Sequence, residues 1–418
     1  MGGEADQHDP YAAFRFRNYR LFAFGSLITL VGTQIQSVAI AWEMYQRTGD
    51  ALALGLVGLV QAVPMFALAL PAGLLADRFN RRTIAAISVL GATFTSLALA
   101  WFSYVQGPIV VMYGLLLLDA IALVMGRPAR ISILPQLVPN EVFPNAVMWR
   151  TSIWQISVVL GPAIGGFVVA WYVPAAYLIA AASTLVFLTA LFLLHYDHID
   201  HTDGQASSTW QSLRDAFAFL WNTRLLLTVV TLDMFAVLLG GATYLMPIFA
   251  ADILKIGSQG LGYLYAAPAV GALVMALFIT HRPPMQSAGR NLLWAVAGFG
   301  VATIVFGLST NLWLSLAMLF LIGAMDNVSV VIRHSMMQMI TPDNMRGRIS
   351  AINSIFIGTS NELGGFESGL LAKLTTPVIS VVVGGVGTIV VVAAAVTSPG
   401  LRRFGSLESV RDEGREDG

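Results

Sequence analysis

Long apolar stretches, each bounded by charged or turn-forming residues, recur along the whole chain. A helix needs about 20 mostly apolar residues to cross a bilayer, and twelve stretches come near that length. They are unbroken rather than alternating with a period of two, so the pattern predicts membrane helices and excludes a barrel. The predicted spans are 20–46, 53–76, 83–105, 108–134, 145–171, 174–195, 224–250, 261–280, 291–308, 312–338, 347–372 and 376–398.

The composition further narrows the class of protein to which the chain can belong. Of 418 residues, 56% are hydrophobic and 11% are charged, with a mean hydropathy of +0.74, whereas soluble domains carry about 25% charged residues. This excludes a soluble enzyme, a disordered chain and a disulfide-stapled secreted domain. The 23 basic residues balance the 23 acidic ones, which argues against a nucleic-acid partner. The absence of cysteine removes thiolate and redox chemistry.

The distribution of basic residues predicts the orientation. The first eighteen residues are polar and lack an apolar h-region, so we expect no cleaved signal peptide. Basic residues gather before the first span and in the even-numbered loops, while the odd-numbered loops hold only Arg47, Lys255 and Lys373. By the positive-inside rule this predicts a multi-pass protein of the cell (inner) membrane with both termini cytoplasmic.

An internal repeat relates the two ends of the chain. At an offset of 204 residues, Asn18–Leu21 aligns with Asn222–Leu225, each leading into a predicted span. At an offset of 203, Arg130 aligns with Arg333. Several matches in register over a whole half favour duplication over chance. Further matches at these offsets are Gly58 with Gly262, Pro64 with Pro268, Ser132 with Ser335, Pro139 with Pro342 and Gly161 with Gly364.

The repeat predicts the domain organisation. Two parallel six-helix halves are a transporter architecture, with the binding site between the halves near the middle of the bilayer. We therefore expect an all-α polytopic membrane protein of 12 transmembrane helices in two pseudo-symmetric six-helix bundles. The expected segments are an N-terminal segment 1–18, a first bundle 19–195, a central cytoplasmic loop 196–222, a second bundle 223–398 and a C-terminal tail 399–418.

The loop between the second and third spans carries a recognisable motif. Gly73 is followed by the pair Asp77-Arg78 and then by the pair Arg81-Arg82, which resembles the signature loop of the major facilitator superfamily. Asn80 stands where that family usually has glycine, a mild departure because asparagine tolerates a left-handed turn. The motif predicts a cytoplasmic gate in which Asp77 meets an arginine or a helix N-terminus. We expect Arg130 and Arg333 to serve the same gate. The alternative is a plain positive-inside turn.

The fifth span contains a second motif. Gly161, Pro162, Gly165 and Gly166 resemble the exporter motif of the same superfamily, found mainly in antiporters. Proline and glycine allow this helix to bend and to approach its neighbour closely, although Gly161 and Gly165 would also suit plain helix packing. Segments 42–49 and 345–348 resemble the branch of drug and siderophore (enterobactin) exporters. The resemblance implies secondary transport by alternating access, usually coupled to protons.

Four acids lie in the middle of apolar spans, where an ionised group is costly. Asp233 and Asp326 are the preferred proton-coupling candidates, followed by Glu362 and Asp119. A carboxylic acid that is alternately buried and hydrated can bind and release a proton. The alternative for each acid is a structural ion pair. Polar and polarisable candidates for lining a substrate cavity are Gln34, Gln36, Tyr244 and Met325.

Other chemistry finds little support. His195, His198 and His201 alternate with aspartates and could gather metal ligands, but the start of a solvated linker is the preferred interpretation, so we expect no metal site. No phosphate-binding loop, nucleophile elbow or triad is present, so we expect no enzyme and no cofactor.

The preferred hypothesis is proton-coupled export of a small amphipathic compound by a monomer. The alternatives are a proton-coupled importer of a small organic nutrient and a transport-inactive membrane scaffold.

Overall fold

The computed structural model describes residues 9–194, 209–282, 287–342 and 345–396. Over these residues the chain is almost entirely helical and contains no strand. The long helices are α1 Arg17–Thr48, α2 Ala51–Arg78, α3 Arg81–Tyr104, α4 Ile109–Ile133, α5 Phe143–Trp171, α6 Val173–Leu193, α7 Thr209–Asn222, α8 Arg224–Leu239, α10 Gly257–Thr280, α11 Ala288–Leu308, α12 Leu312–Ile340, α13 Arg346–Leu374 and α14 Pro377–Val396. Short elements are η1 Ala12–Arg15, η2 Leu134–Gln136, η3 Gly241–Leu245, α9 Met246–Ile248 and η4 Phe249–Ile253.

Eleven helices in the described residues are long and apolar enough to cross a membrane. Each predicted span corresponds to a helical region, but α13 is not among the eleven, although it has 29 residues. This helix carries Glu362, Glu367 and Lys373 within its second half. Large apolar side chains such as Phe66, Trp171 and Trp313 are exposed, as expected of helices that face lipid.

The seventh predicted span, 224–250, is interrupted. Helix α8 ends at Leu239, and the chain continues through the 3-10 turn η3, the single turn α9 and the π-helical turn η4. Gly240 and Gly241 lie at the break and Pro247 follows it. Glycine pairs and proline weaken the helical hydrogen-bond ladder, and 3-10 and π turns replace it here.

The interval 196–222, expected as a loop, ends in a helix. Helix α7 is amphipathic because Ala216, Phe219 and Leu220 recur at helical spacing on its packed face. Its Ala216 and Leu220 are buried in a cluster with Leu226, Ile349 and Ile352. The histidines at 195, 198 and 201 lie outside the described residues.

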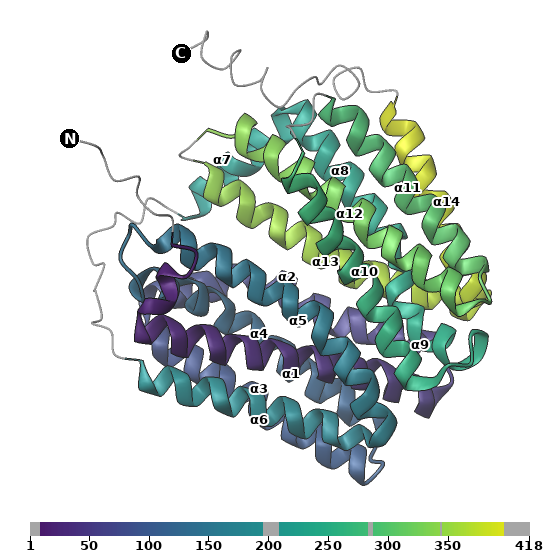
Figure 1. Cartoon of the computed structure of the whole chain (residues 1–418), viewed down its shortest axis with the longest axis horizontal. Coiled ribbons are helices and arrows are strands. Elements are labelled where there is room, and N and C mark those ends of the chain that lie inside the picture. Colours follow the sequence, from purple (N-terminus) through teal and green to yellow (C-terminus); the bar gives the residue numbers. More distant parts are fainter. Residues whose placement is uncertain (1–8, 195–208, 283–286, 343–344, 397–418) are drawn as a thin grey trace. The chain divides into compact units, whose positions relative to one another are not determined.

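The chain divides into two compact units. Unit 1 comprises Met1–Ala39 and Ala67–Asp200, and unit 2 comprises Ile40–Phe66 and His201–Gly418. In unit 1, α3 packs against α4 and α6, around a core that includes Tyr19, Ile133 and Leu191 (Figure 1). In unit 2, α12 packs against α10 and α11, and α8 packs against α13 and α14. The division therefore passes through α1 and α2.

Candidate functional site

A buried ion pair lies inside unit 2. The carboxylate of Asp233 on α8 forms an ion pair with the guanidinium of Arg333 on α12. Both side chains are buried, with 6% and 5% of their surface exposed. Met325 and Asp326 of α12 line a small cavity together with Asp233. Two carboxylates therefore face one cavity beside a single guanidinium. An unbalanced negative charge in such surroundings favours the uptake of a proton or a cation.

Several polar atoms next to this cavity have no hydrogen-bond partner among the described residues. They are Nε of Arg333, Oγ of Ser329 and Oδ1 of Asn327, all on α12 and all buried. Buried polar atoms are normally satisfied by protein, water or ligand. Ser329 also lines the cavity. The hydroxyl of Ser329 can therefore bind a polar group of a molecule in the cavity, a role that the sequence analysis did not assign to Ser329.

A second polar contact in unit 2 joins two predicted site residues. The hydroxyl of Tyr244, on the η3 turn, donates to Oε2 of Glu362 on α13 at 2.8 Å. Gly365 explains how the ring fits, since a Cβ there would lie 2.5 Å from Cδ1 of Tyr244. A Cβ on Gly58 of α2 would lie 2.7 Å from the backbone oxygen of Glu362. The break in the seventh span thus places Tyr244 against α13.

Two further contacts hold the start of α2 and the end of α1 within unit 2. Nζ of Lys373 donates to Oδ2 of Asp50 at 2.7 Å, and the hydroxyl of Tyr45 donates to Asp252. Asp50 lies between α1 and α2, and its hydrogen bond with Lys373 lowers the pKa of this carboxyl. These pairings join residues more than 200 positions apart in the chain, so no local sequence signal could reveal them.

Unit 1 contains its own polar cavity. Asp119 of α4 accepts a hydrogen bond from the hydroxyl of Thr95 at 2.6 Å, and Oε1 of Gln36 accepts from Ser96 at 2.7 Å. Asp119, Gln36 and Arg130 all line this cavity. The structure therefore groups a proton-coupling candidate, a cavity candidate and a gate candidate around one space within unit 1.

The glycine-rich motif of the fifth predicted span faces α1. A Cβ on Gly161 would clash with the side chain of Gln34, and one on Gly165 would lie 3.2 Å from Cα of Ile35. Helix α5 continues through Pro162, and Gly166 is buried with it. The two small residues therefore permit a close approach between α1 and α5. Gln34 lies at this helix contact and does not line the cavity that holds Gln36.

The signature loop connects α2 to α3. Gly73, Asp77 and Arg78 lie in the last turns of α2, although the side chain of Asp77 is outside the described part of the structure. Asn80 has φ −57° and is not left-handed: its side chain caps α3 by accepting from the backbone of Arg82.

Both arginines at the start of α3 bind backbone oxygens of unit 1. Arg81 donates to Ser132 at 3.3 Å and Arg82 donates to Phe192 at 2.5 Å.

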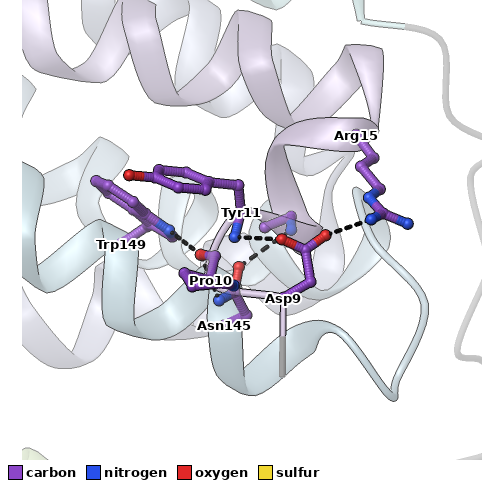
Figure 2. Close-up of polar contacts among 7 residues, drawn as sticks. Asp9, Pro10, Tyr11, Arg15, Asn145 and Trp149 are labelled. Atoms are coloured by element: carbon purple, nitrogen blue, oxygen red, sulfur yellow. Dashed lines mark hydrogen bonds and ion pairs between the residues drawn. The ribbon is translucent and has the colours of Figure 1, made fainter. Parts of the chain in front are cut away.

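The segment before α1 folds back onto α5. Figure 2 shows Nδ2 of Asn145 and Nε1 of Trp149 both donating to the backbone oxygen of Pro10, at 2.9 and 2.8 Å. Oδ1 of Asn145 accepts from the backbone of Ala13. The ring of Tyr11 lies 5.5 Å from that of Trp149. The indole of Trp149 is therefore engaged by the protein's own N-terminal segment.

Among the described residues, no group of three or more His, Cys, Asp or Glu side chains is placed to hold a metal ion.

Comparison with protein families gives a match over nearly the whole chain. The model of a major facilitator family described as "Transmembrane secretion effector" matches residues 8–413. The chain is similar to the enterobactin exporter EntS of Citrobacter koseri, with 27% identity over 398 residues, 94% of this chain and 95% of that protein. It is 27% identical to the enterobactin exporter EntS of Escherichia coli over 390 residues, 92% of this chain and 93% of that protein.

Solved structures share the fold. The nucleoside transporter NupG superimposes with a TM-score of 0.70 at 15% identity, covering 93% of this chain and all of that one. A bacterial homologue of the human lysosomal transporter Spinster gives a TM-score of 0.70 at 14% identity, covering 94% and 96%. At these identities the likeness is one of fold alone.

Proposed function

The chain belongs to the transmembrane secretion effector family of the major facilitator superfamily, a family of multi-pass membrane transporters and not of enzymes, and from this premise we propose that it exports a small amphipathic, siderophore-like compound in exchange for protons. Transport proceeds by alternating access, in which the binding site opens to one side of the membrane at a time. The protein acts as a monomer in the cell (inner) membrane, with both termini in the cytoplasm.

The similarity of this chain to two enterobactin exporters favours export as the direction of transport. Both enterobactin exporters match this chain over more than nine-tenths of its length. Met325, Ser329 and two aspartates line the cavity of unit 2 beside one arginine, and this excess of negative charge disfavours a phosphate ester as the substrate.

Proton coupling rests on one observation: Asp233 and Asp326 face the same cavity, and only Asp233 pairs with Arg333. The ion pair balances one carboxylate, so Asp326 is the group left to change its charge. A proton can neutralise it when the cavity is closed and leave when water enters. Glu362 and Asp119 are further proton sites under this proposal, each held by a hydroxyl, that of Tyr244 or Thr95.

The signature loop and the glycine-rich motif support the proposed movement between the two access states. Arg81 and Arg82 fix the start of α3 to backbone oxygens of unit 1, so that the loop after α2 moves with that unit. Gly161 and Gly165 keep α5 in close contact with α1. We propose that Asp77, Arg78, Arg130 and Arg333 open and close the cytoplasmic side.

The test is sided transport in proteoliposomes. We expect an imposed pH gradient to drive the accumulation of enterobactin or of ethidium in vesicles whose protein is inserted inside out. Asp326→Asn should abolish the dependence on the pH gradient, because its side chain cannot exchange a proton. Glu141→Gln is the matched control, since Glu141 is an exposed acid between η2 and α5.

Three results would contradict the proposal. Proton-driven movement of the same compounds in the opposite direction would show an importer. No transport of either compound would exclude this substrate class. Unchanged pH-driven transport by Asp326→Asn would exclude Asp326 as the coupling acid, and the same result with Asp233→Asn, Glu362→Gln and Asp119→Asn would exclude proton coupling through these four acids.

A further inference from the structure

The cavities of the two units occupy equivalent positions in the repeat. At the offset of 204, Thr29 of the first cavity corresponds to Asp233 of the second, and Ala92 corresponds to Val296. At the offset of 203, Leu123 of the first cavity corresponds to Asp326 of the second. Each cavity also adjoins the arginine of its own half, Arg130 or Arg333. The two spaces can therefore be compared residue by residue.

The arginines differ in how their charge is balanced. Arg333 pairs with Asp233, whereas Arg130 faces a cavity in which threonine, Thr29, takes the place of that aspartate. Among the described residues, Arg130 forms no ion pair, and its hydrogen-bond partner is the backbone oxygen of Leu123, 3.3 Å from Nη2. An unbalanced charge inside a membrane helix bundle is costly. Among the described residues, unit 1 therefore has no ion pair equivalent to that of Asp233 and Arg333, although Asp119 lines the same cavity as Arg130.

The other charged groups nearby do not supply it. Arg127 lies one turn away on α4 and adds a charge of the same sign. Asp119 lies eleven residues away on the same helix, about 16 Å along the axis at about 1.5 Å per residue. Its carboxylate is held by the hydroxyl of Thr95. Among the described side chains, which do not include that of Asp77, no carboxylate forms an ion pair with Arg130.

The lining shows which donors remain for a ligand. The hydroxyls of Thr29, Thr33 and Ser88 donate to backbone oxygens at 2.8, 2.9 and 2.6 Å. Gln36 is 4% exposed, and its Oε1 accepts from Ser96, which directs its amide N–H groups to other partners. The free donors are thus the guanidinium of Arg130 and the amide of Gln36. The space suits a water-sized species.

We propose that the cavity of unit 1 binds a small monovalent anion of the size of chloride, held by Arg130 and Gln36. The anion takes the place that the carboxylate of Asp233 occupies in unit 2. It neutralises Arg130 and stabilises the packing of α1, α3, α4 and α6 around the cavity. The proposed site does not depend on the identity of the transported compound. The anion would share its cavity with Asp119 and its arginine with the proposed cytoplasmic gate, so the test measures chloride binding directly and apart from transport.

The test is chloride binding by the purified full-length protein. Radioactive chloride should bind saturably, and the melting temperature should rise with sodium chloride but not with sodium gluconate at equal ionic strength. Thr29→Asp supplies the missing carboxylate and should remove both effects, while Thr29→Asn, the matched control, should keep them. Arg130→Gln should weaken chloride binding by about tenfold or more, because it removes a charged donor.

Arg130→Lys separates the role of charge from that of folding. We expect it to retain measurable chloride binding, since a lysine keeps the positive charge. The absence of saturable chloride binding in the unaltered protein would overturn the proposal. So would equal stabilisation by gluconate, or chloride binding by Thr29→Asp or Arg130→Gln that matches that of the unaltered protein.

Discussion

Asp233 and Arg333 form a neutral pair that is almost completely withdrawn from solvent. A pair of this kind contributes little net stability compared with apolar residues, but the loss of one partner leaves the other buried and charged. Asp326 shares the cavity without forming an ion pair within the described residues. The two aspartates therefore have different roles. Asp233 stabilises the buried Arg333, and Asp326 is the residue that we propose for proton coupling.

This separation gives a prediction at the level of single residues. Asp233→Asn should lower the free energy of unfolding by about 3–5 kcal/mol, because it leaves Arg333 unpaired in the helix bundle. Combining Asp233→Asn with Arg333→Gln should recover at least half of that loss. Thermal unfolding of the detergent-solubilised protein, followed by tryptophan fluorescence, measures both. Asp326→Asn is the control and should change the melting temperature little. A double variant as unstable as Asp233→Asn alone would contradict the assignment.

The sequence identified the charged and polar side chains of the site but not their partners. Asp233, Asp326 and Glu362 stand out because acids are rare in apolar spans. Tyr244 was chosen as a candidate for the substrate cavity, and the structure places it on Glu362. Such pairs could not be predicted, because Tyr244 and Glu362 are 118 positions apart. Ser329, which also lines the cavity, was missed because a serine in a membrane helix is common enough to carry no signal by itself.

Most helices were predictable because apolar length is a strong signal. The two helices that the sequence pattern did not predict correctly, in the seventh span and at α7, differ from the prediction for local reasons. The seventh span is interrupted where Gly240 and Gly241 meet, since two adjacent glycines remove the propensity that would continue the helix. Helix α7 was expected as part of a polar loop, because its apolar face occupies one side only of a short helix. In both cases the pattern was present in the sequence, but it was weaker than the run of apolar or polar residues around it.

The contact between α2 and α13 gives a prediction for a pair of elements. Gly58→Ala would place a Cβ 2.7 Å from the backbone oxygen of Glu362 and 3.5 Å from the ring of Tyr244. Because a backbone atom cannot move aside alone, the helices must separate, and we expect a loss of about 1–3 kcal/mol in stability. Thermal unfolding of the purified protein measures it. Gly114→Ala in α4 is the matched control, since no heavy atom lies within 4 Å of its added Cβ.

For Gly114→Ala we expect no loss, and a gain of up to about 1 kcal/mol from the better helix propensity of alanine. Equal melting temperatures for the Gly58 and Gly114 variants would show that the contact between α2 and α13 is looser than the distances indicate.

At the scale of the whole chain, the duplication that the sequence predicts would account for both the likeness and the difference of the two cavities. Thr29 and Asp233 lie at equivalent positions, as do Arg130 and Arg333, so a common ancestor of the halves would have placed one arginine in each. Among the described residues, the arginine of the second half forms an ion pair with a carboxylate and that of the first half does not. The same comparison shows Asp119 in the first half without a counterpart in the second, where Ile322 and Gly323 occupy the matching positions. The halves therefore share a framework but divide the charged groups unequally.

The positive-inside pattern gives a prediction for the whole molecule. Glu141 lies between the fourth and fifth predicted spans and Thr310 between the ninth and tenth, and both residues are exposed. Five apolar helical segments separate them, so they should lie on opposite sides of the membrane. Because the chain contains no cysteine, Glu141→Cys and Thr310→Cys each provide a single thiol without background. A membrane-impermeant maleimide should label Thr310→Cys from outside intact spheroplasts and Glu141→Cys only in inverted vesicles. Labelling of both from one side would contradict the number of spans between them, and the reverse pattern would place the termini outside the cytoplasm.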